Sequence, residues 1–257
     1  MPEFAVVAEG ETDARMAQLL AERIFLEEGP DWIREDCTES VPEWVREHYL
    51  PKWSGLESNS TYSTWRTVKH LCTESNFRRA FGHNESGKPR GIYYAQGRNA
   101  LFLLGRLRKT KPIDGLVLVV DLDHQPERRD GLTEARKEVE EAKDQVVILL
   151  ATPNPKQEAW VLNGLVCEGH EAQALEALRQ ELGFDPCHKA EELRAKDETA
   201  KRSAHRVVKA LIGESRERKE KCWTDTPLTI LRERGEATYL NTYLIEVEER
   251  LLPLLTK

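Results

Sequence analysis

Short apolar runs separated by amphipathic stretches dominate the hydrophobic pattern of this chain. Three runs, at residues 4–8, 116–122 and 145–151, are almost entirely apolar and lack the polar–apolar alternation of a half-exposed strand. Strands buried on both faces of a parallel sheet have this continuous apolar pattern. The pattern therefore predicts three buried parallel strands.

A helix is expected directly after the first strand, because apolar residues there recur every three or four positions. These residues are Met16, Leu19, Leu20, Ile24 and Phe25. Thr12 or Asp13 is placed to cap this helix, and Gly29-Pro30 is placed to end it.

Further helices are predicted over residues 95–107, 132–143 and 156–166. The remaining chain is expected to be mostly helical, with helices over residues 171–182, 204–212 and 236–255. Strands and helices alternate through the first part of the chain, which indicates an α/β fold with a parallel sheet flanked by helices.

Residues 29–91 interrupt this alternation with broken helical patterns and polar loops. Four of the six tryptophans fall here, namely Trp32, Trp44, Trp53 and Trp65. We interpret the segment as a helical, Trp-rich insertion with its own small aromatic core, and stacking on nucleic-acid bases is the alternative. The expected organisation is a core of residues 1–28 and 92–166, this insertion, and a helical C-terminal region over residues 167–257.

Composition is typical of a soluble protein, with 39% hydrophobic and 32% charged residues among 257. No apolar run approaches the roughly 20 residues that a membrane-spanning helix needs. The N-terminus has no basic-plus-apolar signal pattern, and the five scattered cysteines are expected to be reduced. These features predict a cytoplasmic protein without a membrane partner.

The formal net charge of −7 does not favour nucleic-acid binding, but two segments are locally basic. Solvated helix faces are the alternative interpretation of such runs. The candidate nucleic-acid contacts are Arg98, Arg106, Arg108, Lys109, Lys201, Arg202 and Arg206.

Acidic residues stand at the carboxyl ends of the first two predicted strands. Glu9 follows the first strand, and Asp121 and Asp123 end the second. Sites in parallel sheets form at these ends, and side chains two apart on a strand point the same way. Converging carboxylates need a cation, so one or two Mg²⁺ or Mn²⁺ ions are expected. Asp13 and His124 are possible additional members, although Asp13 also suits a helix N-terminus.

These residues resemble the motifs of the Toprim domain, which topoisomerases, bacterial primases, recombination mediators and OLD-family nucleases share. The resemblance rests on Glu9-Gly10 at a strand–helix junction and on the Asp-x-Asp of Asp121 and Asp123. The segment from Glu9 to Asp13 is similar to the first motif of OLD-type and small stand-alone Toprim nucleases. Glu158, within Gln-Glu-Ala-Trp, matches a downstream motif of the stand-alone group.

The resemblance covers residues 1–28 and about 92–166, and it implies a Mg²⁺-dependent nuclease acting on DNA or RNA. Glu9 would be a metal ligand or the general base. Glu158 would bind a second metal or act as an orienting partner within the site. Lys156 is placed to neutralise charge on the scissile phosphate. The alternative interpretation of Glu158 and Lys156 is that such residues are simply favoured and solvated at the start of a helix. The chain has no phosphate-loop motif, which fits proteins of this type that act beside a separate ATPase in phage defence.

Two other functions stay open. In the first, a Toprim-fold module binds nucleic acid or a partner without cleaving it. A haloacid-dehalogenase-like phosphatase would use Asp121 as its nucleophile, although His124 follows where that family has a small hydroxylated residue. Zinc bound by Cys167 and His170 with Cys187 and His188 is disfavoured, because the second pair is adjacent rather than spaced.

Overall fold

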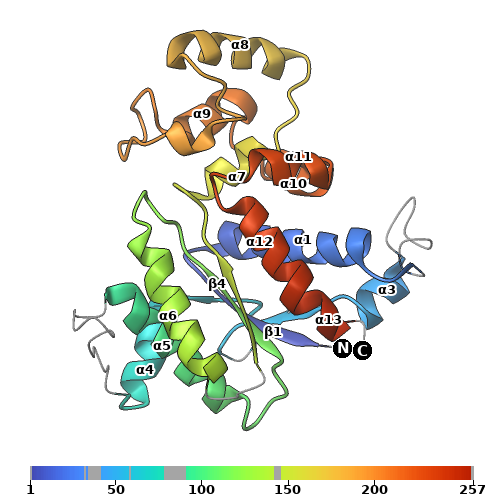
Figure 1. Ribbon diagram of the computed structural model, residues 1–257, viewed down its shortest axis with the longest axis vertical. Coiled ribbons are helices and arrows are strands. Elements are labelled where there is room, and N and C mark those ends of the chain that lie inside the picture. Colours follow the sequence, from blue (N-terminus) through green and yellow to red (C-terminus); the bar gives the residue numbers. More distant parts are fainter. Residues whose placement is uncertain are drawn as a thin grey trace. The chain divides into compact units, whose positions relative to one another are not determined.

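The computed structural model describes residues 2–31, 33, 42–57, 59–77, 91–141 and 146–255. The chain divides into two compact units (Figure 1). The first unit consists of Met1–Val120, Gln125–Ala151 and Glu246–Lys257, and the second consists of Asp121–His124 and Thr152–Ile245.

The first unit contains a five-stranded sheet in which every pairing is parallel. Its strands are β1 (Glu3–Ala8), β2 (Lys52–Ser54), β3 (Ser63–Thr64), β4 (Gly115–Val119) and β5 (Val147–Ala151). The order is β2-β1-β4-β5, and β3 pairs with the end of β1. Val7 pairs with Leu118, which in turn pairs with Leu150. The predicted α/β fold with a parallel sheet flanked by helices is confirmed.

Both faces of the sheet are buried. One face packs its apolar side chains, including Ala5 and Leu116, against three helices. These helices are α4 (Trp65–Glu74), α5 (Ile92–Leu107) and α6 (Glu127–Glu141). Helices α1 (Glu11–Glu28) and α13 (Leu252–Leu255) lie on the other side of the sheet (Figure 1). Phe4 and Val6, which alternate with the first set along β1, are also fully buried. Burial on both faces explains the absence of alternation in the sequence.

The segment at residues 29–91, interpreted above as an insertion with its own aromatic core, contributes strands β2 and β3 to this sheet. Trp53 packs on Phe4 of β1, with ring centroids 6.0 Å apart. Trp65 donates a hydrogen bond from Nε1 to the carbonyl of Val119. Trp44, on α3 (Glu43–His48), is 42% exposed, and Trp32 lies outside the described residues. Strands β2 and β3 satisfy the backbone groups along the open edge of β1, which a detached insertion would leave unpaired.

Several element ends differ from prediction. The second strand ends at Val119 rather than at residue 122. Helix α6 begins at Glu127, inside the loop expected before residue 132, and its predicted end at residue 143 lies outside the described residues. Helix α1 ends at Glu28 as predicted, but its N-cap is Gly10 and no side chain caps it. Thr12 and Asp13 therefore lie inside the first turn.

The second unit is mostly helical, as predicted for this part of the chain. Its helices are α7 (Gln157–Asn163), α8 (His170–Leu182), the short 3-10 turn η1 (Ala190–Glu192), α9 (Ala204–Ile212), α10 (Arg216–Thr224), α11 (Leu228–Arg234) and α12 (Leu240–Glu246). Trp160 is fully buried, stacks on Tyr243 with centroids 5.6 Å apart, and donates Nε1 to the carbonyl of Thr238.

The predicted terminal helix is divided into α12, a π-helical turn η2 (Val247–Leu251) and α13. Glu246, the last residue of α12, belongs to the first unit with the residues that follow it. No helix in the described ranges combines the length and apolarity needed to cross a membrane.

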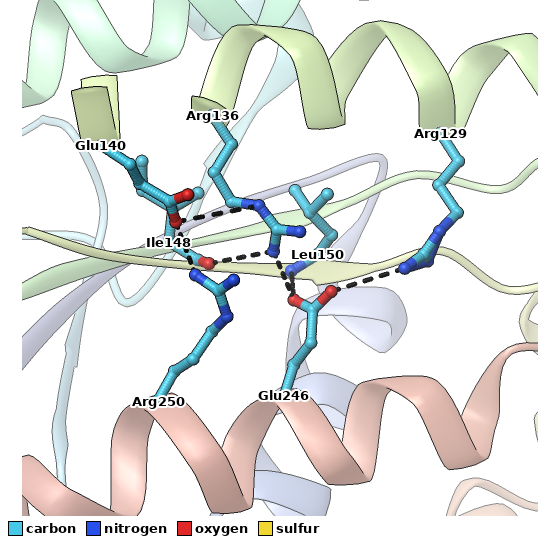
Figure 2. A network of polar contacts seen from close by, with 7 residues as sticks. All are labelled: Arg129, Arg136, Glu140, Ile148, Leu150, Glu246 and Arg250. Carbon is cyan, nitrogen blue, oxygen red and sulfur yellow. Dashed lines mark hydrogen bonds and ion pairs between the residues drawn. The ribbon is translucent and has the colours of Figure 1, made fainter. Parts of the chain in front are cut away.

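Buried charges close the outer edge of β5, the last strand of the described sheet (Figure 2). The Glu246 carboxylate accepts hydrogen bonds from the backbone N–H of Leu150 at 3.0 Å and from Arg136 at 2.7 Å. Arg136 also donates to the carbonyl of Ile148 at 3.4 Å. Arg136 and Glu246 thus provide the hydrogen-bonding groups that a further strand would supply. Arg129 gives the carboxylate a second cationic partner at 3.4 Å.

Candidate functional site

The carboxyl ends of β1 and β4 are neighbours in the first unit. The two strands are parallel and in register from Phe4 opposite Gly115 to Val7 opposite Leu118. Glu9 follows the last residue of β1 directly and is exposed. A peptide bond joins Asp121 to Val120, whose N–H extends the pairing with β5 by donating to the carbonyl of Ala151. Both acidic segments thus begin where neighbouring strands end.

The chain turns sharply after β4. Leu122 donates its N–H to the carbonyl of Pro153, and Asp123 donates to that of Pro155. Asp123 and His124 both have left-handed backbone conformations, with φ of 47° and 59°. The strand alternation that was expected to orient Asp121 and Asp123 therefore does not reach them. Consecutive left-handed residues other than glycine are uncommon and cluster at functional sites.

Asp121 and Asp123 both contact the segment that leads into α7. One carboxylate oxygen of Asp121 accepts a hydrogen bond from the backbone N–H of Gln157 at 3.0 Å. The Lys156 ammonium lies 3.9 Å from a carboxylate oxygen of Asp123. Lys156 and Asp123 keep 37% and 29% of their side chains exposed, so solvent reaches the pair.

Glu158 interacts with a histidine that sequence reasoning did not single out. Its Oε1 lies 3.4 Å from Nδ1 of His205, at the start of α9. The Glu158 side chain is only 15% exposed, whereas His205 is 34% exposed. A carboxylate beside Nδ1 favours the tautomer with the proton on that nitrogen, which leaves the Nε2 lone pair available.

A surface recess in the second unit is lined in part by Asp123, Lys156 and His205. Four segments line it, at residues 123–124, 155–156, 193–198 without Asp197, and 203–205. Lys156, Arg194 and Lys196 bring positively charged side chains to the recess, and Asp123 and Glu198 bring carboxylates. The cavity volume is about 20 Å³, which is room for about one water molecule. The recess therefore suits part of one polar group of a larger ligand rather than a whole cofactor.

His124 forms part of the wall of this recess. Its Nε2 lies 3.4 Å from the carbonyl oxygen of Leu193. Burial lowers the pKa of His124 below its ordinary value, although the Leu193 carbonyl opposes this effect. A mostly neutral ring at neutral pH makes His124 a hydrogen-bonding group rather than a fixed charge.

The described carboxylates match a hard cation in kind but do not form a complete ligand set. Asp121 and Asp123 supply oxygen donors of the type that Mg²⁺ prefers. One Asp121 oxygen, however, accepts a backbone hydrogen bond, and Asp123 lies near an ammonium group. Across the described ranges, no three His, Cys, Asp or Glu side chains are grouped closely enough to hold a metal ion. The residues of the zinc alternative are among those described, and they form no such group either. They are Cys167, His170, Cys187 and His188.

Several candidate nucleic-acid contacts have structural roles. Arg98 forms an ion pair with Glu138 in the first unit. Arg206 binds Glu181 at 3.1 Å in the second unit, where Arg202 also lies over the ring of Phe184. The remaining candidates are the exposed Arg106, Lys109 and Lys201 and the half-buried Arg108.

The structure thus groups Asp121, Asp123, Lys156 and Glu158 within the second unit, and it places Glu9 and Asp13 in the first. The sequence analysis missed Arg194, Lys196 and His205. No motif marks them, because Arg194 and Lys196 lie in an irregular loop whose shape is not encoded by periodicity. No protein-family model, curated protein or solved structure matches the chain.

Proposed function

We propose that this chain is a divalent-metal-dependent phosphodiesterase that cleaves nucleic acid, with a Toprim-type arrangement of acids. The register of β1 and β4 is the observation that carries the proposal, because it makes the carboxyl ends of the two strands neighbours. Glu9 follows one end, and Asp121 and Asp123 follow the other. Acids at adjacent ends of parallel strands occupy the position where ligands bind in open α/β sheets.

Asp121 and Asp123 would hold the cation, with Glu158 of the same unit as a further candidate ligand. Glu9, which follows β1, stays a predicted ligand or general base. A bound divalent cation would neutralise phosphate charge and make a water molecule more acidic. Lys156 would hold a non-bridging phosphate oxygen, since its ammonium lies beside Asp123 and is partly exposed. His205 would accept or donate a proton at Nε2, because Glu158 faces its other ring nitrogen.

The proposal predicts Mg²⁺- or Mn²⁺-dependent cleavage of supercoiled plasmid or transfer RNA by the purified protein. Asp121→Ala and Asp123→Ala should each lower the cleavage rate at least about 100-fold, the usual range for loss of an electrostatic catalytic group. Asp130→Ala is the matched control, because Asp130 is an exposed carboxylate on α6. Unchanged cleavage by Asp121→Ala would contradict the proposal.

A nucleic-acid-binding module that does not cleave is the second candidate. It is favoured by the lack, among the described side chains, of a three-residue metal-binding group. In that case, wild type and Asp121→Ala would bind the same substrates equally, and neither would cleave them in Mg²⁺ or Mn²⁺. A phosphatase with Asp121 as nucleophile stays a prediction, as does a separate ATPase partner in phage defence.

A further inference from the structure

We propose that the recess lined by Lys156, Arg194, Lys196 and the start of α9 holds a backbone phosphate of the nucleic-acid substrate. This inference rests on the proposed function for the identity of the ligand. It adds Arg194 and Lys196 as binding residues, neither of which belongs to the predicted set of contacts. Four observations within the second unit support it.

The first observation is that the loop carrying these cations has a defined shape. The N–H of Ala195 donates to the carbonyl of Arg202 at 3.0 Å, which closes the loop at its base. Asp197 accepts hydrogen bonds from the N–H of Thr199 at 2.9 Å and from its hydroxyl at 2.8 Å. Asp197 thus fixes the turn at residues 197–199, and it does not line the recess.

The second observation concerns the charges at the recess. Lys196 is exposed and makes no ion pair with any residue that the structure describes. Arg194 is 62% exposed and has one partner, Glu192, at 3.3 Å. The Lys156 ammonium lies 3.9 Å from a carboxylate oxygen of Asp123, which makes this ion pair a long one. Exposed cations with weak or no internal partners can exchange solvent for phosphate oxygens at little cost.

The third observation is the start of α9. The Ser203 hydroxyl accepts the N–H of Arg206 and so caps one of the free backbone donors. Ala204 and His205, which precede Arg206 in the first turn, line the recess. N–H groups in the first turn lack acceptors within the helix and are favourable neighbours for an anion. They add to the three cationic side chains.

The fourth observation is position and size. The recess includes Asp123 and Lys156, so a phosphate held there would adjoin the residues proposed for cleavage. With a volume of about 20 Å³ it accepts part of one group, while the ligand continues across the open surface. A single nucleic-acid strand carries phosphates at regular intervals. One of its phosphates can therefore lie at the recess next to Asp123 and Lys156, while the rest of the strand continues across the surface.

The inference is tested by nucleic-acid binding in EDTA, where cleavage cannot occur. The probe is a fluorescein-labelled 20-nucleotide single strand, made as DNA and as RNA. Arg194→Glu with Lys196→Glu should weaken binding at least tenfold. This double variant should also reduce the slope of log affinity against log salt by about two, because each phosphate-contacting cation contributes about one.

Lys189→Glu with Lys219→Glu is the matched control, since it makes the same charge change in the second unit outside the recess. The control should bind within twofold of wild type. Equal weakening by both double variants would overturn the inference, as would unchanged binding by the first or absence of binding by wild type. Circular dichroism checks folding, and Arg194→Gln with Lys196→Gln replaces the charge reversal if that variant does not fold.

In a second experiment, inorganic phosphate is titrated against the bound nucleic-acid probe at constant ionic strength. Displacement of the strand only at millimolar phosphate is expected for a backbone site. Displacement at micromolar phosphate would overturn the inference in favour of a free-phosphate site. If Asp121→Ala cleaves like wild type in Mg²⁺ while Arg194→Glu with Lys196→Glu still weakens binding in EDTA, the proposed function fails and the binding result stands.

Discussion

Glu171 illustrates, at the scale of single residues, how hydrogen bonds from a cation give a buried carboxylate a pH-dependent contribution to stability. It is 7% exposed at the start of α8, and both carboxylate oxygens lie 2.7 Å from Arg218. Hydrogen bonds from Arg218 hold the pKa of Glu171 below its ordinary value of 4.5, although burial opposes the shift. The contribution is therefore present above pH 4.5 and is lost as the pH falls through the lowered pKa.

Glu171→Gln is predicted to lower the free energy of unfolding by about 1–3 kcal/mol at pH 7, the range for a hydrogen bond to a charged group. The difference from wild type should shrink as the pH falls from 5 to 3, because wild type then loses the same charge. Urea denaturation at several pH values measures this. Glu217→Gln is the control, since Glu217 is 80% exposed in its pair with Lys221. A constant deficit across the pH range would contradict the prediction.

The acids at the strand ends show how far residue-level prediction reaches. Glu9 and Asp121 were identifiable because each directly follows a continuous apolar run. The orientation of Asp123 was not identifiable, because β4 ends at Val119 and the turn at Asp123 and His124 depends on hydrogen bonds to Pro153 and Pro155. These bonds join segments about 30 residues apart, which no local pattern encodes.

At the scale of elements, side chains from two helices bind the backbone at the edge of β5. Arg136 comes from α6 and Glu246 from α12, and together they bind backbone groups of Ile148 and Leu150 (Figure 2). Their side chains are each only 10% exposed. A buried pair of this kind is costly to break, because the partner left behind keeps an uncompensated charge.

Glu246→Ala is predicted to lower the stability of the first unit by about 3–5 kcal/mol, as expected for a broken buried ion pair. Arg136→Met combined with Glu246→Leu should recover part of this loss, because the isolated charge is removed as well. Chemical denaturation of Arg136→Met, of Glu246→Leu and of the double variant measures the coupling. Glu141→Ala, from a pair with Lys137 in which both side chains are 65% exposed, should have little effect. Additive losses would contradict the prediction.

At the scale of the whole molecule, the first unit combines an early segment of the chain with a late one. Its sheet begins with β1, and the segment from Glu246 onward returns to it at the C-terminus. Val247 and Leu251 of this segment are fully buried. Such a long return along the chain makes the unit dependent on residues far from β1 in the sequence.

A chain truncated after Ile245 is therefore predicted to lose cooperative unfolding of the first unit. The truncation removes Val247, Leu251 and the carboxylate of Glu246, so amides of β5 such as Leu150 should exchange much faster. Hydrogen exchange with mass spectrometry, together with thermal denaturation, tests this. Full-length Val247→Ala with Leu251→Ala should show an intermediate loss. Protection of β5 equal to that of the full chain would contradict the prediction.

The sequence by itself determined the α/β class, the parallel strands and the acids that follow two of them. Each follows from local composition, since continuous apolar runs require burial on both sides. Only the tertiary structure decided that β2 and β3 extend the sheet, that Arg136 and Glu246 close its edge, and that Arg194 and Lys196 share a recess with Lys156. These features join segments far apart in the chain. They depend on which surfaces pack together and which backbone groups need partners, and periodicity carries no information about either.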